Sequence, residues 1–195
     1  MAISLIVGLG NPGPTYALTR HNMGIIFIEK LCQSQHTNLS TETKLNARTS
    51  KIIINEKMVR VACPTTFMNI SGQSLGKLAR YYALAPDEIL VVHDELDLEA
   101  GQIRFKTGGG HGGHNGLRDI ITHLHATEFH RLRIGIGRPA HPRVEVADYV
   151  LNRPTLDEEI AIHAAIEQGF NALPEIIACN WPIVMQRLHT FNNRK

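Results

Sequence analysis

The order of apolar and polar positions predicts a chain in which strands and helices alternate. Continuous apolar runs at 4–9 and 88–93 are typical of strands that are buried on both faces of a sheet. Apolar residues with helical spacing occur in the segments 22–33, 71–83 and 117–124. Because each of these elements has an apolar face to bury, we expect an α/β fold with three layers, in which helices flank a twisted mixed β-sheet.

Shorter apolar runs add antiparallel strands to this prediction. The runs 51–55 and 58–63 lie around Asn55-Glu56-Lys57, as the two strands of a β-hairpin do. Alternation over 102–107 and an apolar run over 130–137 predict two further strands.

The last third of the chain combines one short strand signal with strong helix signals. A short strand is expected over 146–151. The capping box Thr155-Leu-Asp-Glu158 predicts the start of the longest helix. Pro174 lies inside that helical pattern and predicts a kink or a break there.

Composition narrows the class of protein. A chain of 195 residues, 43% of them hydrophobic, is expected to form one domain, residues 1–195. Its cysteines, Cys32, Cys63 and Cys179, lie far apart without a C-x-x-C pair, which argues against a disulfide framework. No apolar run approaches the roughly 18 residues that a membrane span needs, and no basic segment precedes the first one, as it would in a signal peptide. We therefore expect a cytoplasmic protein without a membrane partner, and a monomer, because no coiled-coil or apolar interface stripe is visible.

Charge is unevenly distributed along the chain although the formal net charge is only +2. The segment 101–143 contains seven Arg or Lys residues and two acidic residues, whereas 87–99 contains six acidic residues and no Arg or Lys. A local basic face on a nearly neutral protein fits a polyanionic partner held at a restricted site. The alternative is an ordinary solvated surface.

The segment Gly8-Leu-Gly10-Asn-Pro-Gly13 fits the G-x-G-x-x-G pattern of dinucleotide-binding turns. In such proteins the motif leads directly into a helix, and an acidic residue about 20 positions further on holds the ribose. Here Pro12 and Pro14 predict a loop instead, and Glu29 lies inside the following helical pattern. The pattern is therefore a weak indication of NAD binding.

Polar residues gather where the pattern predicts loops and strand ends. Asn11 and Asp94 follow predicted strands, at the sheet edge where open α/β proteins place their ligand sites. Further candidates are His21, Asn69 and Asn115, and no G-x-S-x-G nucleophile motif is present. A neutral imidazole oriented by a carboxylate activates water, and carboxamides stabilise an oxyanion. This inventory favours hydrolysis of an activated ester by water.

The motifs that carry these residues resemble those of one family. In chain order they are VGLGNPG, TRHN, PTTFMNxSG, HDELD, GGGHGGHNGL and FHRLRIGIG, within about residues 5–137. In this combination the chain is similar to bacterial peptidyl-tRNA hydrolases. The resemblance implies a metal-independent esterase that frees tRNA from a prematurely released peptide, with no cofactor. After about Arg138 it is weaker, and the expected role of residues 139–195 is to cover the cleft and contact the acceptor stem.

The same resemblance implies a role for each matching residue. His21 would be the catalytic base and Asp94 its partner, and Asn115 would contact the attacking water or the oxyanion. The peptide-binding residues would be Asn11, Tyr16, Met68, Asn69 and Asn115. The 5′-terminal phosphate of tRNA would be bound by Lys106 and Arg133.

Two alternatives remain open. A non-catalytic RNA-binding protein would use the basic segment and the glycine loop but would not need His21 and Asp94. A zinc site is suggested by the histidines of the segment 111–130, but the sequence contains no H-E-x-x-H motif. We therefore expect no metal.

Overall fold

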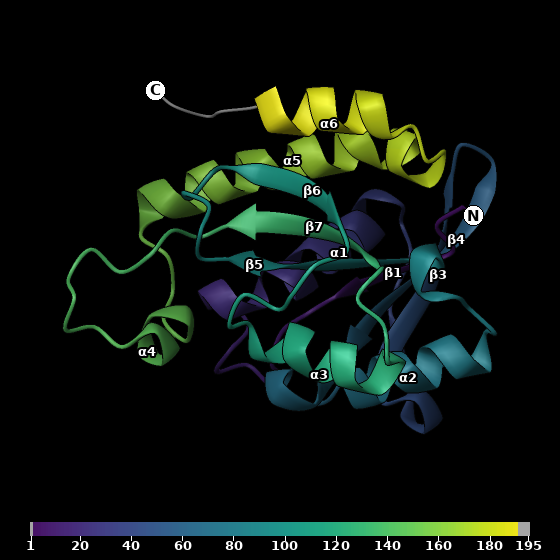
Figure 1. Cartoon of the computed structure of the whole chain (residues 1–195), viewed down its shortest axis with the longest axis horizontal. Helices are drawn as coiled ribbons and strands as arrows, with labels where there is room; N and C mark the ends of the chain where they lie inside the picture. Colours follow the sequence, from purple (N-terminus) through teal and green to yellow (C-terminus); the bar gives the residue numbers. More distant parts are fainter. Residues whose placement is uncertain (1, 191–195) are drawn as a thin grey trace.

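One mixed β-sheet forms the centre of the molecule (Figure 1). The structure is a computed structural model and describes residues 2–190. The seven strands have the order β2-β3-β4-β1-β5-β7-β6. Parallel pairing joins β4 to β1, β1 to β5 and β5 to β7. Antiparallel pairing joins β2 to β3, β3 to β4 and β6 to β7. The strands are β1 (Leu5–Gly8), β2 (Ser40–Glu42), β3 (Ala47–Ile54), β4 (Lys57–Pro64), β5 (Ile89–Glu95), β6 (Ile103–Thr107) and β7 (His130–Gly135).

Helices cover both faces of this sheet. α1 (Met23–Ser34), α5 (Leu156–Ile177) and α6 (Trp181–Thr190) pack on one face, and α2 (Ser71–Tyr81) and α3 (Asn115–Leu124) pack on the other. The short helix α4 (Val146–Val150) lies apart from both layers, beside the ends of β5 and β7 (Figure 1). The predicted three-layer α/β fold is confirmed, whereas the predicted domain bounds of 1–195 include positions outside the described residues.

The first four residues of β5 are apolar because both faces of the strand are buried there. Leu90 and Val92 belong to the hydrophobic core under α1 and α5, whereas Ile89 and Val91 belong to the core under α2 and α3. All four side chains are fully buried. Because successive side chains in a strand point to opposite faces, the part of a central strand that lies between two helical layers needs apolar residues at successive positions.

The predicted hairpin is present, with a two-residue turn. Ile54 pairs with Lys57, and both turn residues, Asn55 and Glu56, have left-handed backbone angles, with φ of 48° and 62°. This matches the type I′ turn that the twist of paired strands favours. β3 begins at Ala47, four residues before the predicted start, and the sequence pattern did not reveal the edge strand β2.

Two predictions for the last third of the chain were wrong in part. The segment 146–151 forms the helix α4 and not a strand, because Val146 and Val150 are four residues apart and so share one helical face. A short apolar run fits both periods. α5 begins with the predicted capping box but continues past Pro174 to Ile177 without a break, and the sequence pattern did not separate α6 from it.

Candidate active site

Parallel pairing brings the candidate residues to one edge of the sheet. β4, β1 and β5 are neighbours that run in the same direction, so the loops after them start side by side. These loops carry Asn69 after β4, Asn11 and His21 after β1, and Asp94 lies at the end of β5 itself. The expected convergence at a carboxyl edge is therefore seen in the structure.

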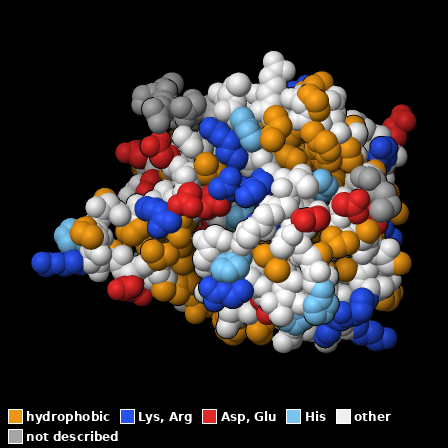
Figure 2. Space-filling model, in the orientation of Figure 1, with side chains coloured by type: hydrophobic (Ala, Val, Ile, Leu, Met, Phe, Trp, Pro, Cys, Tyr) orange, Lys and Arg blue, Asp and Glu red, His pale blue; other side chains and the backbone are white. Residues whose placement is uncertain are grey.

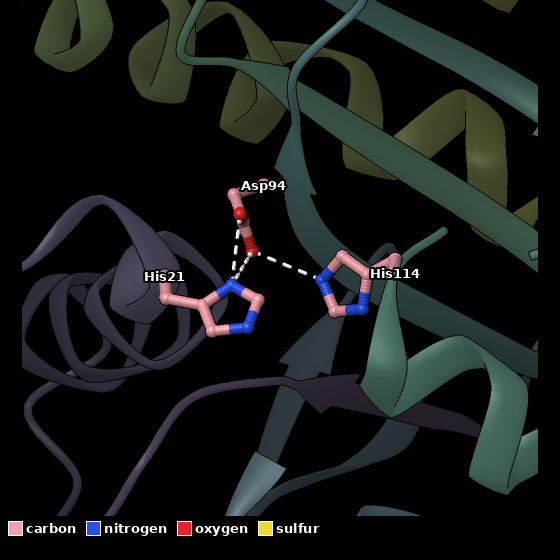
Figure 3. Close-up of side chains that lie close together, drawn as sticks. All are labelled: His21, Asp94 and His114. Atoms are coloured by element: carbon pink, nitrogen blue, oxygen red, sulfur yellow. Dashed lines mark hydrogen bonds and ion pairs between the residues drawn. The ribbon is translucent and has the colours of Figure 1, made fainter. Parts of the chain in front are cut away.

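Asp94 lies between two imidazoles that come from different elements (Figure 3). Nδ1 of His21, in the 3-10 turn η1 (Arg20–Asn22), lies 3.0 Å and 2.9 Å from the two carboxylate oxygens. Nε2 of His114, the residue before α3, lies 3.0 Å from Oδ1. The Asp94 side chain is 2% exposed, so this carboxylate is satisfied by histidines and not by water.

His114 is the site residue for which the sequence predicted no role. Its Nδ1 accepts hydrogen bonds from the backbone N–H groups of Gly116 at 3.1 Å and Leu117 at 3.3 Å. Because Nδ1 accepts, the proton of the neutral ring is on Nε2, which then donates to Asp94. The start of α3 therefore fixes the tautomer of His114. A histidine just before a helix in a glycine-rich loop was the available signal.

Electrostatics shift the pKa values of His21 and Asp94 in opposite directions. Burial acts to raise the pKa of Asp94, but the charges of His21 and His114 and their hydrogen bonds outweigh it and hold that pKa well below its usual range. Burial acts to lower the pKa of His21, but the charge and hydrogen bond of Asp94 outweigh it and raise the pKa. Asp94 therefore stays ionised and stabilises the imidazolium form of His21.

Neighbouring His93 is excluded from acid–base chemistry near neutral pH. It is almost fully buried, and its Nδ1 donates to the backbone carbonyl of Asp94 at 2.7 Å. Burial, with help from His114, lowers the pKa of His93 to about 3. This side chain is a neutral support behind the site.

The cluster His21, Asp94 and His114 has ligand atoms within 4.8 Å of one another, as a metal site requires. The hydrogen bonds oppose that use. A metal ion would bind a ring nitrogen without a proton, but Nε2 of His114 carries the proton as long as Nδ1 accepts from α3. The same argument applies to Nδ1 of His21, which donates to Asp94. The donor set fits a hydrogen-bonded carboxylate better than an ion.

A cavity of about 210 Å³ opens in front of the pair. Its lining includes His21, Asp94 and Asn115 together with residues of α4. Nε2 of His21 has no hydrogen-bond partner among residues 2–190 and is the free nitrogen of that ring. The arrangement can take a proton from a water molecule in the cavity.

The predicted peptide-binding residues lie together on the β1 and β4 side of the site. The side-chain Oδ1 of Asn11 accepts from the backbone N–H of Met68 at 2.7 Å, which leaves its Nδ2 without a partner in the described part of the chain. Tyr16 packs edge-on against Phe67. Asn69 is exposed beside buried Met68 in the 3-10 turn η3 (Met68–Ile70).

Gly116 links this group to the first residue of α3. A Cβ atom there would lie 2.6 Å from the sulfur of Met68. The close approach allowed by this glycine places the loop after β4 next to Asn115 at the N-terminus of α3.

The two predicted phosphate ligands share a basic face of the sheet. Arg104 pairs with Arg133 across β6 and β7, and Lys106 pairs with Arg131, so all four side chains leave the sheet on the same side. Figure 2 shows Lys and Arg side chains gathered over this part of the molecule. Lys106 is exposed, whereas Nε of Arg133 donates to Glu95 at 2.9 Å.

Glycines of the G-x-G-x-x-G segment allow close packing and a turn. A Cβ at Gly8 would lie 2.1 Å from the carbonyl oxygen of Gly24, so β1 and α1 approach each other closely. Gly13 has φ of +96° and forms a turn in a loop that continues to η1. No helix begins at the motif, in contrast to a dinucleotide-binding turn.

Comparisons with known proteins agree with this geometry. A family model described as peptidyl-tRNA hydrolase matches residues 5–195. The chain belongs to the peptidyl-tRNA hydrolase family. The peptidyl-tRNA hydrolase of Pseudomonas aeruginosa (strain LESB58) is 49% identical over 190 residues, 97% of each chain. That of Coxiella burnetii (strain CbuG_Q212) is 50% identical over 188 residues, 96% of this chain and 98% of its own.

The crystal structure of peptidyl-tRNA hydrolase from Acinetobacter baumannii has the same fold, with a TM-score of 0.93 at 43% identity. The alignment covers 97% of this chain and 96% of that one. The family likeness therefore extends beyond the motifs of the first 137 residues and includes the C-terminal helices. Among residues 2–190 no helix combines the length and the apolar character needed to cross a membrane.

Proposed function

We propose that this protein hydrolyses the ester bond between peptide and tRNA in peptidyl-tRNA, with water as the nucleophile. One observation carries the proposal. An imidazole, His21, is hydrogen-bonded through Nδ1 to a buried carboxylate and has its other nitrogen free at a cavity. Membership of the peptidyl-tRNA hydrolase family supports the same substrate. The reaction releases tRNA with a free 3′ end together with the peptide acid.

His21 would act as the general base. Its Nε2 takes a proton from water as the oxygen attacks the ester carbonyl, and the proton then passes to the leaving ribose oxygen. Asp94 holds the ring in the tautomer that leaves Nε2 free and stabilises the imidazolium ion that forms. His114 supports this role, because its fixed Nε2–H keeps the carboxylate aligned.

The carboxamides would bind the groups around the reacting carbon. Asn115, at the first turn of α3 and lining the cavity, is suited to hold the water or the oxyanion. The free Nδ2 of Asn11 and the exposed amide of Asn69 are suited to the peptide backbone. Tyr16 and Met68 shape the adjoining walls, and Lys106 and Arg133 would bind the 5′ phosphate beside the acceptor stem.

The proposal also includes an oligomeric state and a cellular location. A monomer is favoured because the sequence has no coiled-coil pattern or apolar interface stripe. A cytoplasmic location is favoured because Cys32, Cys63 and Cys179 lie far apart in the sequence without a C-x-x-C pair, which argues against a disulfide framework.

A single experiment tests the reaction and its substrate class. We expect the protein to release tRNA from N-acetylaminoacyl-tRNA and to leave aminoacyl-tRNA largely intact. In the proposed substrate the α-amino group of the esterified residue is part of a peptide bond, whereas in aminoacyl-tRNA it is free. A chelator should not change the rate, since the tautomers at Asp94 oppose metal binding. Binding of the substrate without turnover would favour the alternative, a non-catalytic RNA-binding protein.

Replacement of Asp94 by Asn tests the coupling to His21. Activity near neutral pH should fall, although less than when the base itself is removed. The pKa of His21 is raised by Asp94, and the base works only when neutral, so activity is lost as the pH falls through that raised value. Without the carboxylate this acidic limb of the pH–rate profile should move to lower pH. Superimposable profiles for the two proteins would show that the side chains do not act together.

Two substitutions of Asn115 separate hydrogen bonding from packing. Asn115→Asp keeps the shape but places a negative charge beside a developing one, so its activity should fall below that of Asn115→Ala. The fold should respond in the opposite way, because an acidic residue in the first turn of α3 interacts favourably with the helix dipole. Thermal melting and turnover of both variants provide the measurement. If Asn115→Asp is the more active variant, the residue acts by packing or as an acceptor.

A further inference from the structure

Arg20 is a buried cation beside the proposed base, and its contacts are not explained by the mechanism above. Its side chain is 7% exposed. A buried guanidinium is costly unless its donors are satisfied, so its partners indicate its role. Nη2 donates to the carboxylate of Glu158 in the first turn of α5 at 2.7 Å, and the guanidinium lies 4.1 Å from the ring centre of Tyr149.

The remaining contacts of Arg20 reach the end of α4. Nη1 lies 3.4 Å from the carbonyl oxygens of Tyr149 and Asn152 and 2.8 Å from that of Arg153. The backbone N–H of Arg20 also donates to the carbonyl of Asn152, at 3.0 Å. These bonds attach Arg20 to the carbonyl of Tyr149 in α4 and to those of Asn152 and Arg153 just after it.

At its C-terminal end α4 is also held by packing, because Val150 is buried in the hydrophobic core and Tyr149 packs against it, whereas its N-terminal part is not covered. Residues 140–148 are exposed, and Val146 retains 40% exposure although it lines the cavity. A helix of five residues is not stable by itself. Apart from Arg20, the hydroxyl of Tyr149 provides an anchor by donating to the carbonyl of Ile136 at 2.7 Å.

The opposite face of α4 forms a wall of the catalytic cavity. Val146, Ala147 and Val150 line it together with His21 and Asp94. Figure 1 shows α4 beside the ends of β5 and β7. Arg20 and His21 are consecutive residues of η1, so one short turn presents the base to the cavity and also contacts the helix that forms one of its walls.

We propose that Arg20 is a positioning residue, which holds α4 at a fixed place over the cavity so that the acyl group of the substrate is enclosed between α4 and His21. The inference rests on the proposed function. Arg20 does not touch the reacting atoms in this scheme. It acts through the carbonyl groups at the end of α4 and through Glu158.

The test combines kinetics with hydrogen exchange in three variants of the full chain. Arg20→Gln removes the charge, and Arg20→Lys keeps the charge but not the planar guanidinium group with its several donors. Glu158→Gln weakens the ion pair between Arg20 and α5. Glu175→Gln is the matched control, because Glu175 also lies in α5 and pairs with an arginine, Arg187, away from the site. N-acetylaminoacyl-tRNA is the substrate, and amide exchange is followed over residues 145–153.

Arg20→Gln should raise KM by about 10-fold with a smaller change in kcat, since displacement of a wall by about 1 Å is enough for such an effect. Exchange over residues 145–153 should become faster while that of β5 is unchanged. Arg20→Lys and Glu158→Gln should show smaller changes of the same kind. Glu175→Gln should behave as the unmodified protein.

Two results would overturn the inference. One is a folded Arg20→Gln protein with unchanged exchange over residues 145–153. The other is a loss of kcat alone, which would mean that Arg20 acts on His21 and not on α4. If Arg20→Gln does not fold, Arg20→Lys and Glu158→Gln decide by the same readouts. If the unmodified protein shows no turnover, the proposed function has failed, and the exchange data still decide whether Arg20 anchors α4.

Discussion

Replacing His21 by Ala should reduce turnover of N-acetylaminoacyl-tRNA by about 100-fold to 10,000-fold, the usual contribution of a general base. The loss should appear in kcat, because the imidazole acts on water and not on the tRNA. Binding of the substrate, measured at equilibrium, should stay close to that of the unmodified protein. The acidic limb of the pH–rate profile, which reports the raised pKa of His21, should disappear with the side chain.

His111→Ala is the matched control for this prediction. His111 lines the same cavity, but its Nδ1 accepts from the backbone of Gly113 and, within residues 2–190, it makes no hydrogen bond to Asp94. We expect a much smaller loss of turnover. A His21→Ala protein that keeps more than half of the activity would show that another group activates the water. Circular dichroism and thermal melting must show that both variants are folded.

Removing both the Lys106 and the Arg133 side chains should weaken the binding of tRNA substrates while leaving the chemical step intact. Both side chains leave the β6–β7 face that also carries Arg104 and Arg131. If they bind the 5′ phosphate, KM should rise strongly in the double alanine variant while kcat is maintained. The dependence of log KM on log salt concentration should become shallower, by up to about one unit for each side chain that no longer binds phosphate.

Two controls separate a phosphate site from a general charge effect. Lys51→Ala with Lys57→Ala removes the same charge from the exposed β3–β4 hairpin and should leave KM almost unchanged. A substrate whose tRNA lacks the 5′ phosphate should be used about equally by the unmodified protein and the Lys106/Arg133 variant. Equal losses on both substrates, with an unchanged salt slope, would mean that the two residues are structural. Arg133→Ala also frees Glu95, so the single variants should be measured as well.

Much of the fold could be predicted from periodicity. The fully apolar run of β5 required a strand between two helical layers, and the structure shows that arrangement. The turn at Asn55 and Glu56 and the capping box at Thr155 depend on neighbouring residues only, so local sequence specified them. A short apolar run fits both the helical and the strand period. For this reason the strand that was predicted over 146–151, where the structure has α4, was wrong.

The residue types at the sheet edge were also predictable, and the family resemblance implied the pairing of His21 with Asp94, whereas the contact between Asp94 and His114 was not predicted. Asn11 and Asp94 could be placed at one edge, since parallel strands end together. That Asp94 accepts from two imidazoles depends on the start of α3 lying beside the end of β5. Sequence spacing carries no information about such an approach between segments 20 residues apart and more.

By itself the sequence determined the layers, the hairpin, most elements and the inventory of polar groups, because local periodicity and turn chemistry act over a few residues. Tertiary structure decided the tautomer of His114, the charge state of Asp94 and the contact between Arg20 and α4. Each of these depends on burial and on partners that are distant in the chain. Hydrogen-bond direction and pKa are set by the groups that surround a side chain in space, and only folding brings those groups together.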